Sequence, residues 1–569
     1  MAPDEVDFDR GPAPAVQVRQ AHGMEAHWRQ RAPGAPPRPP GDPRGAHPWR
    51  RANPASDSPL ARQASTTIRA SASRQYRRPT TAARSVSLAI RVSSLARPRA
   101  ERASRKMAPR ENMGRADAYG ELAERWSWQD GGRALAFSLR KGVQWHDGKP
   151  FTVRDVKCTF DMVRAAPNAA AKLRVNPRQD WYSNVEAIDT PDGFTVIFRL
   201  RRPQPSLLLM LATDHSPVYP AHVPVKEFCT RCVGTGPFRL KEYRTSEYVL
   251  LEKNPNYFIG GRPYLDGLKF VIIEDRSTQV AALQAGQLDV SPAGWSRGNA
   301  EAAKTAVPQL TVIETSSNVN DNILVNFKRP PFTDIRVRRA LNLALDRKSY
   351  IQGPRQGGAV PGSAMLPKPF GAWGLAPDDL ARLPGTGDAA KQKEEAKKLL
   401  AEAGFGPAKP MRLNVSTRAV AIYVDVASWM IDQLKRVGIQ ATLEQVESAV
   451  WFGKMTRHDY DVALNLTGAG IDDPDANLYQ NYRCGSPRDY SDYCSEEIDR
   501  LMDEQSQTLD PSRRLQLVQE IDRKLQLDGA RPILGWQTRY IVLWPHVRGW
   551  VPQVSLHNGN RMQETWLDR

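Results

Sequence analysis

Three carboxylates follow a short loop in the last quarter of the chain. Asp472, Asp473 and Asp475 come shortly after a strand that we expect to end at Leu466. Ligands of open α/β sheets bind outside the carboxyl ends of the strands, so this position indicates a binding site. The alternative interpretation is that residues 473–475 (DPD) only cap the helix that follows, because Asp is a preferred N-cap residue.

The five cysteines are a second group of residues that could carry chemistry. They are Cys158, Cys229, Cys232, Cys484 and Cys494. Their spacing allows two short-loop disulfides, 229 with 232 and 484 with 494, as in an oxidising compartment. A zinc site or a redox pair is the alternative, but residues 229–232 (CTRC) run into VGTGP instead of opening a helix, and no His follows at ligand spacing. We therefore favour disulfides or inert thiols, and expect neither a metal nor a cofactor.

Motifs of the common enzymes are missing from the sequence. There is no GxSxG elbow, HExxH pair or phosphate loop, which disfavours an enzyme such as a hydrolase. His146 and Asp147 are adjacent and precede Gly148, a pattern more typical of a tight turn than of a catalytic pair. The GTGP segment at 234–237 is interpreted as a rigid bend that leads into a strand at Phe238.

The hydrophobic pattern predicts mixed sheets flanked by helices in two blocks. Residues 135–143 alternate as a strand, a turn follows, and Thr152 can cap the next helix. Further strands are expected at 194–200, 248–252, 268–273, 413–416, 461–466 and around 533. Further helices are expected at 277–287, 335–347, 390–403, 422–437, 495–505 and 511–527. The fold class is therefore two-lobed α/β.

Positive charge is concentrated at the N-terminus. Of the formal net charge of +18, residues 1–110 contribute most, with 21 Lys/Arg against 8 Asp/Glu. They are rich in Arg, Pro, Ala and Ser without clear periodicity, which predicts disorder. A nucleic-acid tail is one interpretation. An upstream or out-of-frame stretch joined to a truncated gene is favoured, because the few aromatic residues there do not form the series that a base-stacking platform would require. Neither a secretory signal pattern nor an apolar run of about 20 residues is visible.

An ordered series of segments resembles the solute-binding proteins of ABC importers, family 5, the oligopeptide, dipeptide and nickel-binding class. The first two are residues 122–126 (LAERW) and 139–156 (LRKGVQWHDGKPFTVRDV). The others are VGTGPF at 233–238, NPNYF at 254–258, GRPYLD at 261–266, ALQAGQLD at 282–289, PPFTDIRVRRALNLALDR at 330–347, AKKLLAEAGF at 396–405 and DDPD at 472–475. Any single segment could arise by chance, but their order and separations make the set specific.

The resemblance implies a type II periplasmic-binding-protein-like fold, with two lobes, two crossing strands and an extra subdomain in lobe one. Lobe one would comprise 118–322 and 538–569, and lobe two 323–537. Residues 1–117 would be a disordered basic segment that is not native to the family. The strand and helices that precede LAERW in the family have no visible match, so lobe one is expected to be incomplete at its start.

The resemblance also implies a ligand between the lobes, whose closure excludes water and strengthens polar contacts. A carboxylate near Gly470 would hold the ligand's amino group; Asp472 is the nearest candidate and Asp473 its neighbour. Arg418 and Arg483 are candidates to face a carboxylate. Candidates for lining the site are Trp295, Trp451, Tyr479 and Trp536, although a buried aromatic is more often part of a core.

The implied function is that of an extracytoplasmic subunit that captures a peptide or similar small solute. It would deliver the solute to the permease subunits of an ABC transporter and, through them, to the ATPase subunits. We expect a monomer that binds no nucleic acid. A binder of nickel or a haem-type ligand within the same family is the alternative, although the nine His residues form no clustered pair in the body of the chain.

Limited proteolysis tests the predicted disorder of the N-terminus. A segment with little aliphatic content and much Pro and Arg cannot offset the entropy of ordering. We expect a protease to trim the chain to about residue 115 and to leave a stable core. Mass spectrometry of the product locates the new terminus, and an intact N-terminal fragment would contradict the prediction.

Overall fold

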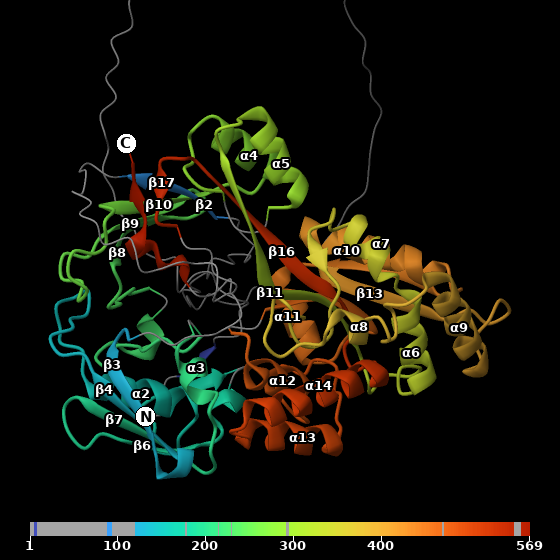
Figure 1. Ribbon diagram of the computed structural model, residues 1–569, viewed down its shortest axis with the longest axis horizontal. Helices are drawn as coiled ribbons and strands as arrows, with labels where there is room; N and C mark the ends of the chain where they lie inside the picture. Colours follow the sequence, from blue (N-terminus) through green and yellow to red (C-terminus); the bar gives the residue numbers. More distant parts are fainter. Residues whose placement is uncertain are drawn as a thin grey trace, which may run out of the picture. The chain divides into compact units, whose positions relative to one another are not determined.

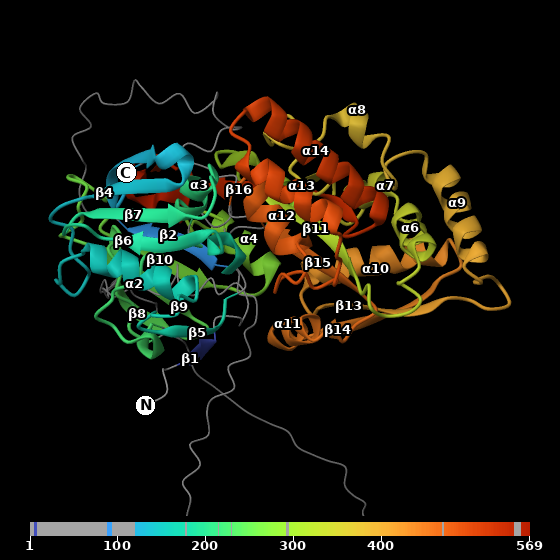
Figure 2. The same ribbon diagram turned by 90° about the horizontal axis from the view of Figure 1, so that it is seen from below.

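The computed structural model describes residues 5–7, 88–93 and 120–568, with gaps at 177–178, 214, 229, 292–294, 469–470 and 551–558. An antiparallel sheet in the order β3-β4-β7-β6 comes first (Figure 2). Its strands are β3 (Ala123–Gln129), β4 (Ala134–Leu139), β6 (Val185–Asp189) and β7 (Thr195–Leu200). Leu135, Trp181 and Phe198 are buried beside it, together with Phe160 of helix α2 (Val153–Val163).

A second antiparallel sheet has the order β2-β10-β9-β8. Its strands are β2 (Leu88–Ser93), β8 (Phe238–Arg244), β9 (Tyr248–Lys253) and β10 (Gly267–Ile272). Strand β2 pairs with β10 over its whole length. An edge strand is not predicted here, because the alternation of Leu88, Ile90 and Val92 is short and lies within a basic segment whose composition predicts disorder.

The largest sheet is mixed and has the order β12-β16-β11-β15-β13-β14. Its strands are β11 (Thr311–Val325), β12 (Ala359–Val360), β13 (Arg412–Arg418), β14 (Gln440–Val446), β15 (Val462–Gly468) and β16 (Ile533–Leu543). Strand β13 runs parallel to both β14 and β15, whereas β11 runs antiparallel to β15 and β16. Two-stranded pairs complete the strands: β1 (Glu5–Asp7) with β5 (Lys172–Val175), and β17 (Val547–Arg548) with β18 (Trp566–Leu567).

Helices follow the strands along the chain (Figure 1). They are α3 (Leu207–Leu211), α4 (Arg276–Gln284), α5 (Arg297–Ala306), α6 (Ile335–Ala344), α7 (Arg347–Gln352), α8 (Pro377–Leu380), α9 (Ala389–Glu402), α10 (Ala421–Lys435), α11 (Ser448–Thr456), α12 (Pro474–Tyr482), α13 (Glu496–Gln507) and α14 (Pro511–Asp528). Short 3-10 helices lie at Asp130–Gly132, Gln179–Tyr182, Val225–Glu227 and Gly559–Glu564.

The long strands β11 and β16 lie side by side and reach two hydrophobic cores (Figure 1). Tyr540 and Val542 of β16 pack with α4 and α5, whereas Ile323 and Val325 of β11 pack with α6, α10 and β13. The predicted domain boundaries at 322 and 538 fall within these strands and stay a prediction. Residues 5–7 and 88–93 form strands within the segment that is predicted to be disordered, and for the rest of 1–117, which lies outside the described residues, the disorder stays a prediction.

The predicted helix at 335–347 is in fact two helices. Helix α6 ends at Ala344, and Asp346 caps α7 by accepting hydrogen bonds from the backbone N–H groups of Lys348 and Ser349. An Asp side chain that satisfies the free N–H groups of a helix start favours a new helix over continuation of the old one. The other predicted strands and helices are present, with ends shifted by a few residues.

His146 connects the predicted turn to the GTGP bend. Its Nδ1 accepts a hydrogen bond from the Gly234 N–H at 3.2 Å, and its Nε2 lies 3.0 Å from the Gly236 carbonyl oxygen. These partners require a neutral ring with the proton on Nε2. Asp147 instead lies 2.8 Å from His222 Nε2 and 3.3 Å from an Arg231 nitrogen, so the two residues serve separate contacts and the turn interpretation is supported.

We predict that His146→Ala lowers the free energy of unfolding by about 1–2 kcal/mol at pH 8, because two backbone groups lose their partner. Burial lowers the pKa of His146 below its ordinary value of 6.5. The unfolded chain therefore binds the proton more readily, and the His146 contribution is present above about pH 6.5 and lost as the pH falls. Urea unfolding of both proteins between pH 5 and pH 8 measures this.

His222→Ala is the matched control, since it removes a histidine that contacts Asp147 of the turn and leaves the hydrogen bonds between His146 and the GTGP bend in place. The difference in stability between wild type and His146→Ala should shrink at acid pH. An equal difference at every pH would contradict the assignment of the neutral ring.

Candidate functional site

The carboxyl ends of parallel strands bring the candidate site together. Strands β13, β14 and β15 run in the same direction, so Arg418 at the end of β13 and the loop after β15 lie at one edge of the sheet. Arg418 contacts β15 directly, with a nitrogen 3.5 Å from the Asn465 amide oxygen. Asp472 follows β15 by a few residues. The edge predicted to bind a ligand therefore carries one basic and one acidic candidate.

Arg418 is a buried cation surrounded by aromatic rings. Its guanidinium carbon lies 3.9 Å from the ring centre of Tyr423, 5.4 Å from that of Trp451 and 5.2 Å from that of Phe452. A nitrogen also contacts the Tyr423 hydroxyl. Burial lowers the pKa of Arg418, and no Asp or Glu among the described residues forms an ion pair with it. Nε has no hydrogen-bond partner in the described part of the chain, so the cation retains capacity for an anion.

A run of small polar residues in β11, which is not among the predicted site residues, lies next to this edge. Asn320 and Asn322 are buried, and the Asn322 amide nitrogen donates to Asn320 and, at 2.9 Å, to the hydroxyl of Thr467. Within the described residues, the hydroxyls of Ser317 and Ser416 are buried without a hydrogen-bond partner. The signal in the sequence was the polar run 316–322 (SSNVNDN) inside an otherwise apolar strand, where buried polar groups require partners.

Asp472 lacks a cationic partner among the described residues. Its Oδ2 accepts a hydrogen bond from the backbone N–H of Ala372 at 2.7 Å, and its carbonyl oxygen accepts one from Trp373 Nε1 at 3.1 Å. Burial of the carboxyl group raises the pKa of Asp472 to about 7, the Ala372 hydrogen bond opposes this, and the nearby Asp473 adds to it. A carboxylate in this environment would gain from a ligand cation.

Asp473 takes the alternative role foreseen for it. It caps α12 by accepting from the Asp475 N–H, and both of its oxygens bind the Arg514 guanidinium at 3.1 and 3.2 Å. The side chain is buried, and Arg514 neutralises its charge. The geometry therefore makes Asp473 a structural residue and does not support a ligand contact.

Arg483 and Tyr479 also have partners of their own. Arg483 forms two hydrogen bonds with Asp503, at 2.8 and 3.3 Å, and the Tyr479 hydroxyl donates to the same carboxylate at 2.7 Å. A guanidinium that is paired in this way has little to offer a ligand carboxylate. The structure therefore favours Arg418 over Arg483 for that role.

The tryptophan candidates pack in hydrophobic cores. Trp295 lies among α4 and α5 residues and donates from Nε1 to Gln279 at 3.2 Å. Trp536 packs against Leu366 and donates to the Ser363 carbonyl at 3.0 Å. Trp451 is buried as well, but its ring lies near Arg418. Trp451 therefore remains a candidate for lining the site.

Cys484 and Cys494 are bonded to each other, with Cα atoms 4.6 Å apart. The loop that they close carries Tyr490, which packs in one core with Trp451 and Phe452. Cys229 lies outside the described residues, so its pairing with Cys232 stays a prediction. In the described part of the chain, no group of three or more His, Cys, Asp or Glu residues could hold a metal ion, and no helix is long and apolar enough to cross a membrane.

A mixed α/β fold with a polar site at the carboxyl ends of its strands is an arrangement that binds small ligands. The sequence model of one family, the bacterial extracellular solute-binding proteins, family 5, matches residues 117–489 of this chain. The chain belongs to this family, which implies an extracytoplasmic or periplasmic protein. Its members and relatives are binding proteins rather than enzymes.

Known relatives span most of the chain. The oligopeptide-binding protein AppA of Bacillus subtilis is 26% identical over 477 residues, 78% of this chain and 83% of that protein. Di/tripeptide-binding protein 2 of Pseudomonas aeruginosa is 27% identical over 438 residues, 72% and 79% of the two chains. The structure of Bacillus subtilis AppA with a nonapeptide matches with a TM-score of 0.67 at 24% identity and covers 79% of this chain and 90% of that one. The predicted two-lobed periplasmic-binding-protein-like fold is confirmed.

We predict that replacing both Cys484 and Cys494 by Ser lowers the free energy of unfolding by about 3 kcal/mol, because the unfolded chain regains the entropy of a short closed loop. Guanidinium unfolding under non-reducing conditions measures the loss. Non-reducing peptide mapping of exported protein should recover the two peptides joined. Free thiols on both residues in such material would contradict the pairing.

Proposed function

We propose that this protein captures a short peptide or a similarly sized zwitterion and delivers it to the permease subunits of an ABC transporter, and through them to the ATPase subunits. It acts as a monomer outside the cytoplasm. Family membership and the peptide-binding relatives support the transport role. The ligand contacts are the finer part of the proposal and rest on the geometry of the sheet edge.

The observation that carries the proposal is a pair of opposite charges that lack ion partners within the described residues. Arg418 and Asp472 lie at the same edge of the sheet, and their protein contacts are to neutral groups. The neighbouring Asp473, by contrast, is paired with Arg514. Arg418 is buried and Asp472 is half-buried, and an unpaired charge in such a place is costly, so a solute with one anionic and one cationic end would be stabilised at this edge.

Arg418 would hold the carboxylate of the solute, and Asp472 would hold its amino group. The aromatic rings of Tyr423, Trp451 and Phe452 lie near the guanidinium and limit the access of water to it. Charge-assisted hydrogen bonds are stronger in such a desolvated place than in water. The small polar residues of β11 supply further donors and acceptors for a peptide main chain.

We predict that Asp472→Asn weakens the binding of trialanine by roughly 30-fold to several thousand-fold, because the amino group loses its charged partner. The amide oxygen of Asn can still accept from the Ala372 N–H, so the neighbouring loop keeps its contact. N-acetyl-trialanine lacks the cationic end and should be affected little by the substitution. Isothermal titration calorimetry of both proteins with both peptides provides the comparison.

Asp432→Ala is a matched control on the same part of the chain, since it removes a carboxylate whose partner is the exposed Arg436. It should bind trialanine as wild type does. Equal affinity of wild type and Asp472→Asn for trialanine would exclude Asp472 from the site. Mass spectrometry of small molecules released from the denatured, purified protein would then identify the natural solute class.

A further inference from the structure

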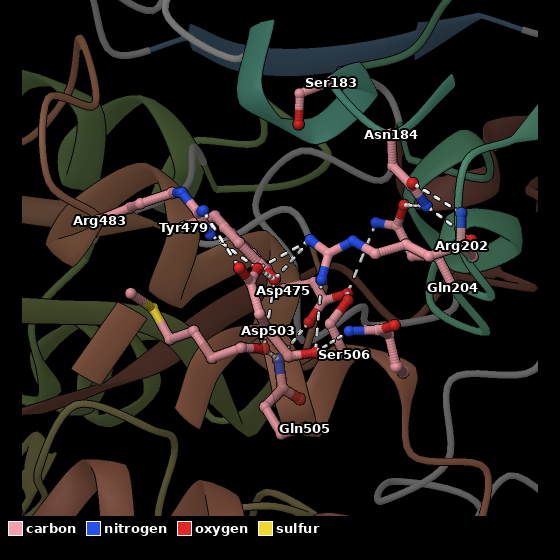
Figure 3. Close-up of polar contacts among 12 residues, drawn as sticks. Ser183, Asn184, Arg202, Gln204, Asp475, Tyr479, Arg483, Asp503, Gln505 and Ser506 are labelled. Carbon is pink, nitrogen blue, oxygen red and sulfur yellow. Dashed lines mark hydrogen bonds and ion pairs between the residues drawn. The ribbon is translucent and has the colours of Figure 1, made fainter. Parts of the chain in front are cut away.

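The short segment 202–206 (RPQPS) connects β7 to α3 and makes contacts far along the chain (Figure 3). An Arg202 nitrogen lies 2.7 Å from Asp503 Oδ1 and 3.3 Å from the Tyr479 hydroxyl. The Ser206 hydroxyl donates to Asp475 Oδ2, and Gln204 Nε2 lies 3.5 Å from the same oxygen. These contacts join the part of the chain assigned to lobe one to helices α12 and α13 of lobe two.

Apolar burial accompanies the polar contacts. Ile471 and Ala476, at the start of α12, share a hydrophobic core with Trp181, Leu207 and Met210. Asp475 is fully buried. The segment and the helix therefore exclude water from their contact, which strengthens its hydrogen bonds.

The acids on the α12–α13 side have partners within their own part of the chain. Asp503 receives hydrogen bonds from Arg483 and Tyr479, and Asp475 receives them from Ser506, at 2.7 Å, and from Gln505. Loss of Arg202 and Ser206 as partners would leave neither carboxylate without a donor. Undocking of the segment therefore leaves no buried charge without a partner. A buried charge without a partner is costly and would otherwise keep the interface closed.

The 202–206 side is also held by its own neighbours. Asn184 donates to the Arg202 carbonyl at 2.9 Å and to the Gln204 amide oxygen at 3.0 Å, and accepts from the Arg202 N–H. Pro203 and Pro205 restrict the backbone between these contacts. The segment therefore keeps its shape whether or not it is docked, and docking costs little conformational entropy.

We propose that residues 202–206 form a reversible latch, which docks on α12 and α13 when the lobes close and so sets the solute affinity through the population of the closed state. This rests on the proposed function, because closure serves capture. Helix α12 begins directly after Asp472 and Asp473, so the latch holds the helix that follows the solute loop. A contact that stabilises only the closed state raises the fraction of the protein in that state. The apparent affinity for the solute rises by the same factor.

Hydrogen exchange of the full-length protein tests the latch without any solute. In wild type, 202–210 and 474–482 should exchange faster than β11, because the latch opens while the sheet does not. In the double variant R202A/S206A, both segments should exchange about tenfold faster again, with β4 and β7 unchanged. Arg201→Ala is the matched control, since the side chain of this neighbouring arginine bonds the Ser183 carbonyl, at 2.9 Å, and forms no hydrogen bond or ion pair with α12 or α13 among the described residues.

Two results would overturn the proposal. If 202–210 and 474–482 are as protected as β11 in wild type and stay so in the double variant, the contact is a permanent part of the fold. If exchange rises in β4 and β7 as well, the substitutions have loosened the packing of the first sheet. Arg202→Lys keeps the charge and should restore most of the protection, which a loss of packing volume alone would not predict.

Binding of trialanine then links the latch to capture. Calorimetry should show about tenfold weaker binding by the double variant, and wild-type affinity for Arg201→Ala. Unchanged affinity together with faster exchange would contradict the control of affinity by the latch. If wild type does not bind trialanine, the proposed solute class fails, whereas the exchange comparison still decides whether the latch opens.

Discussion

The pairing of β11 with β16 organises the elements around it. The two strands are hydrogen-bonded from Thr311 to Asn322, and at one end they pack with α4 and α5 while at the other they belong to the six-stranded sheet. The register shifts between Ser316 and Asn320. Elements that are more than two hundred residues apart in the sequence are thus held in fixed relation by one ladder of backbone hydrogen bonds. The polar run of β11 is placed beside the candidate site for the same reason.

Charge pairing separates structural residues from candidate ligand residues near α12. Arg514 neutralises Asp473, and Asp503 neutralises Arg483, so these groups are satisfied by the protein itself. Burial acts to raise the pKa of Asp503, but hydrogen bonds from Arg483, Tyr479 and Arg202 outweigh it and lower the pKa to about 2. Asp472 shows the opposite behaviour: burial raises its pKa to about 7, and no cation among the described residues stands beside it to oppose this. The same residue type therefore has two roles within a stretch of about thirty residues.

Sequence patterns were sufficient for most elements of the fold. Helices α9, α10, α13 and α14 have clear helical periodicity, and β7 and β9 alternate, so local preferences and burial agree. The errors arose where one local signal overrode another. Asp346 divides the predicted helix at 335–347, and the alternation at 88–93 was hidden within a segment whose composition predicts disorder. The polar run in β11 was missed because its partners come from β15, far along the chain.

The family, the order of strands and helices, and the position of a group of acids after a strand can all be predicted from the residues alone. So can the candidate pair Cys484 and Cys494, whose short separation is visible without a structure. Which charges are already paired becomes clear from the folded chain alone. Arg483 meets Asp503 from the next helix, Asp473 meets Arg514 from α14, and Arg418 meets only aromatic rings and neutral groups among the described residues. The partner of a charged side chain depends on contacts between distant segments, and no local pattern encodes it.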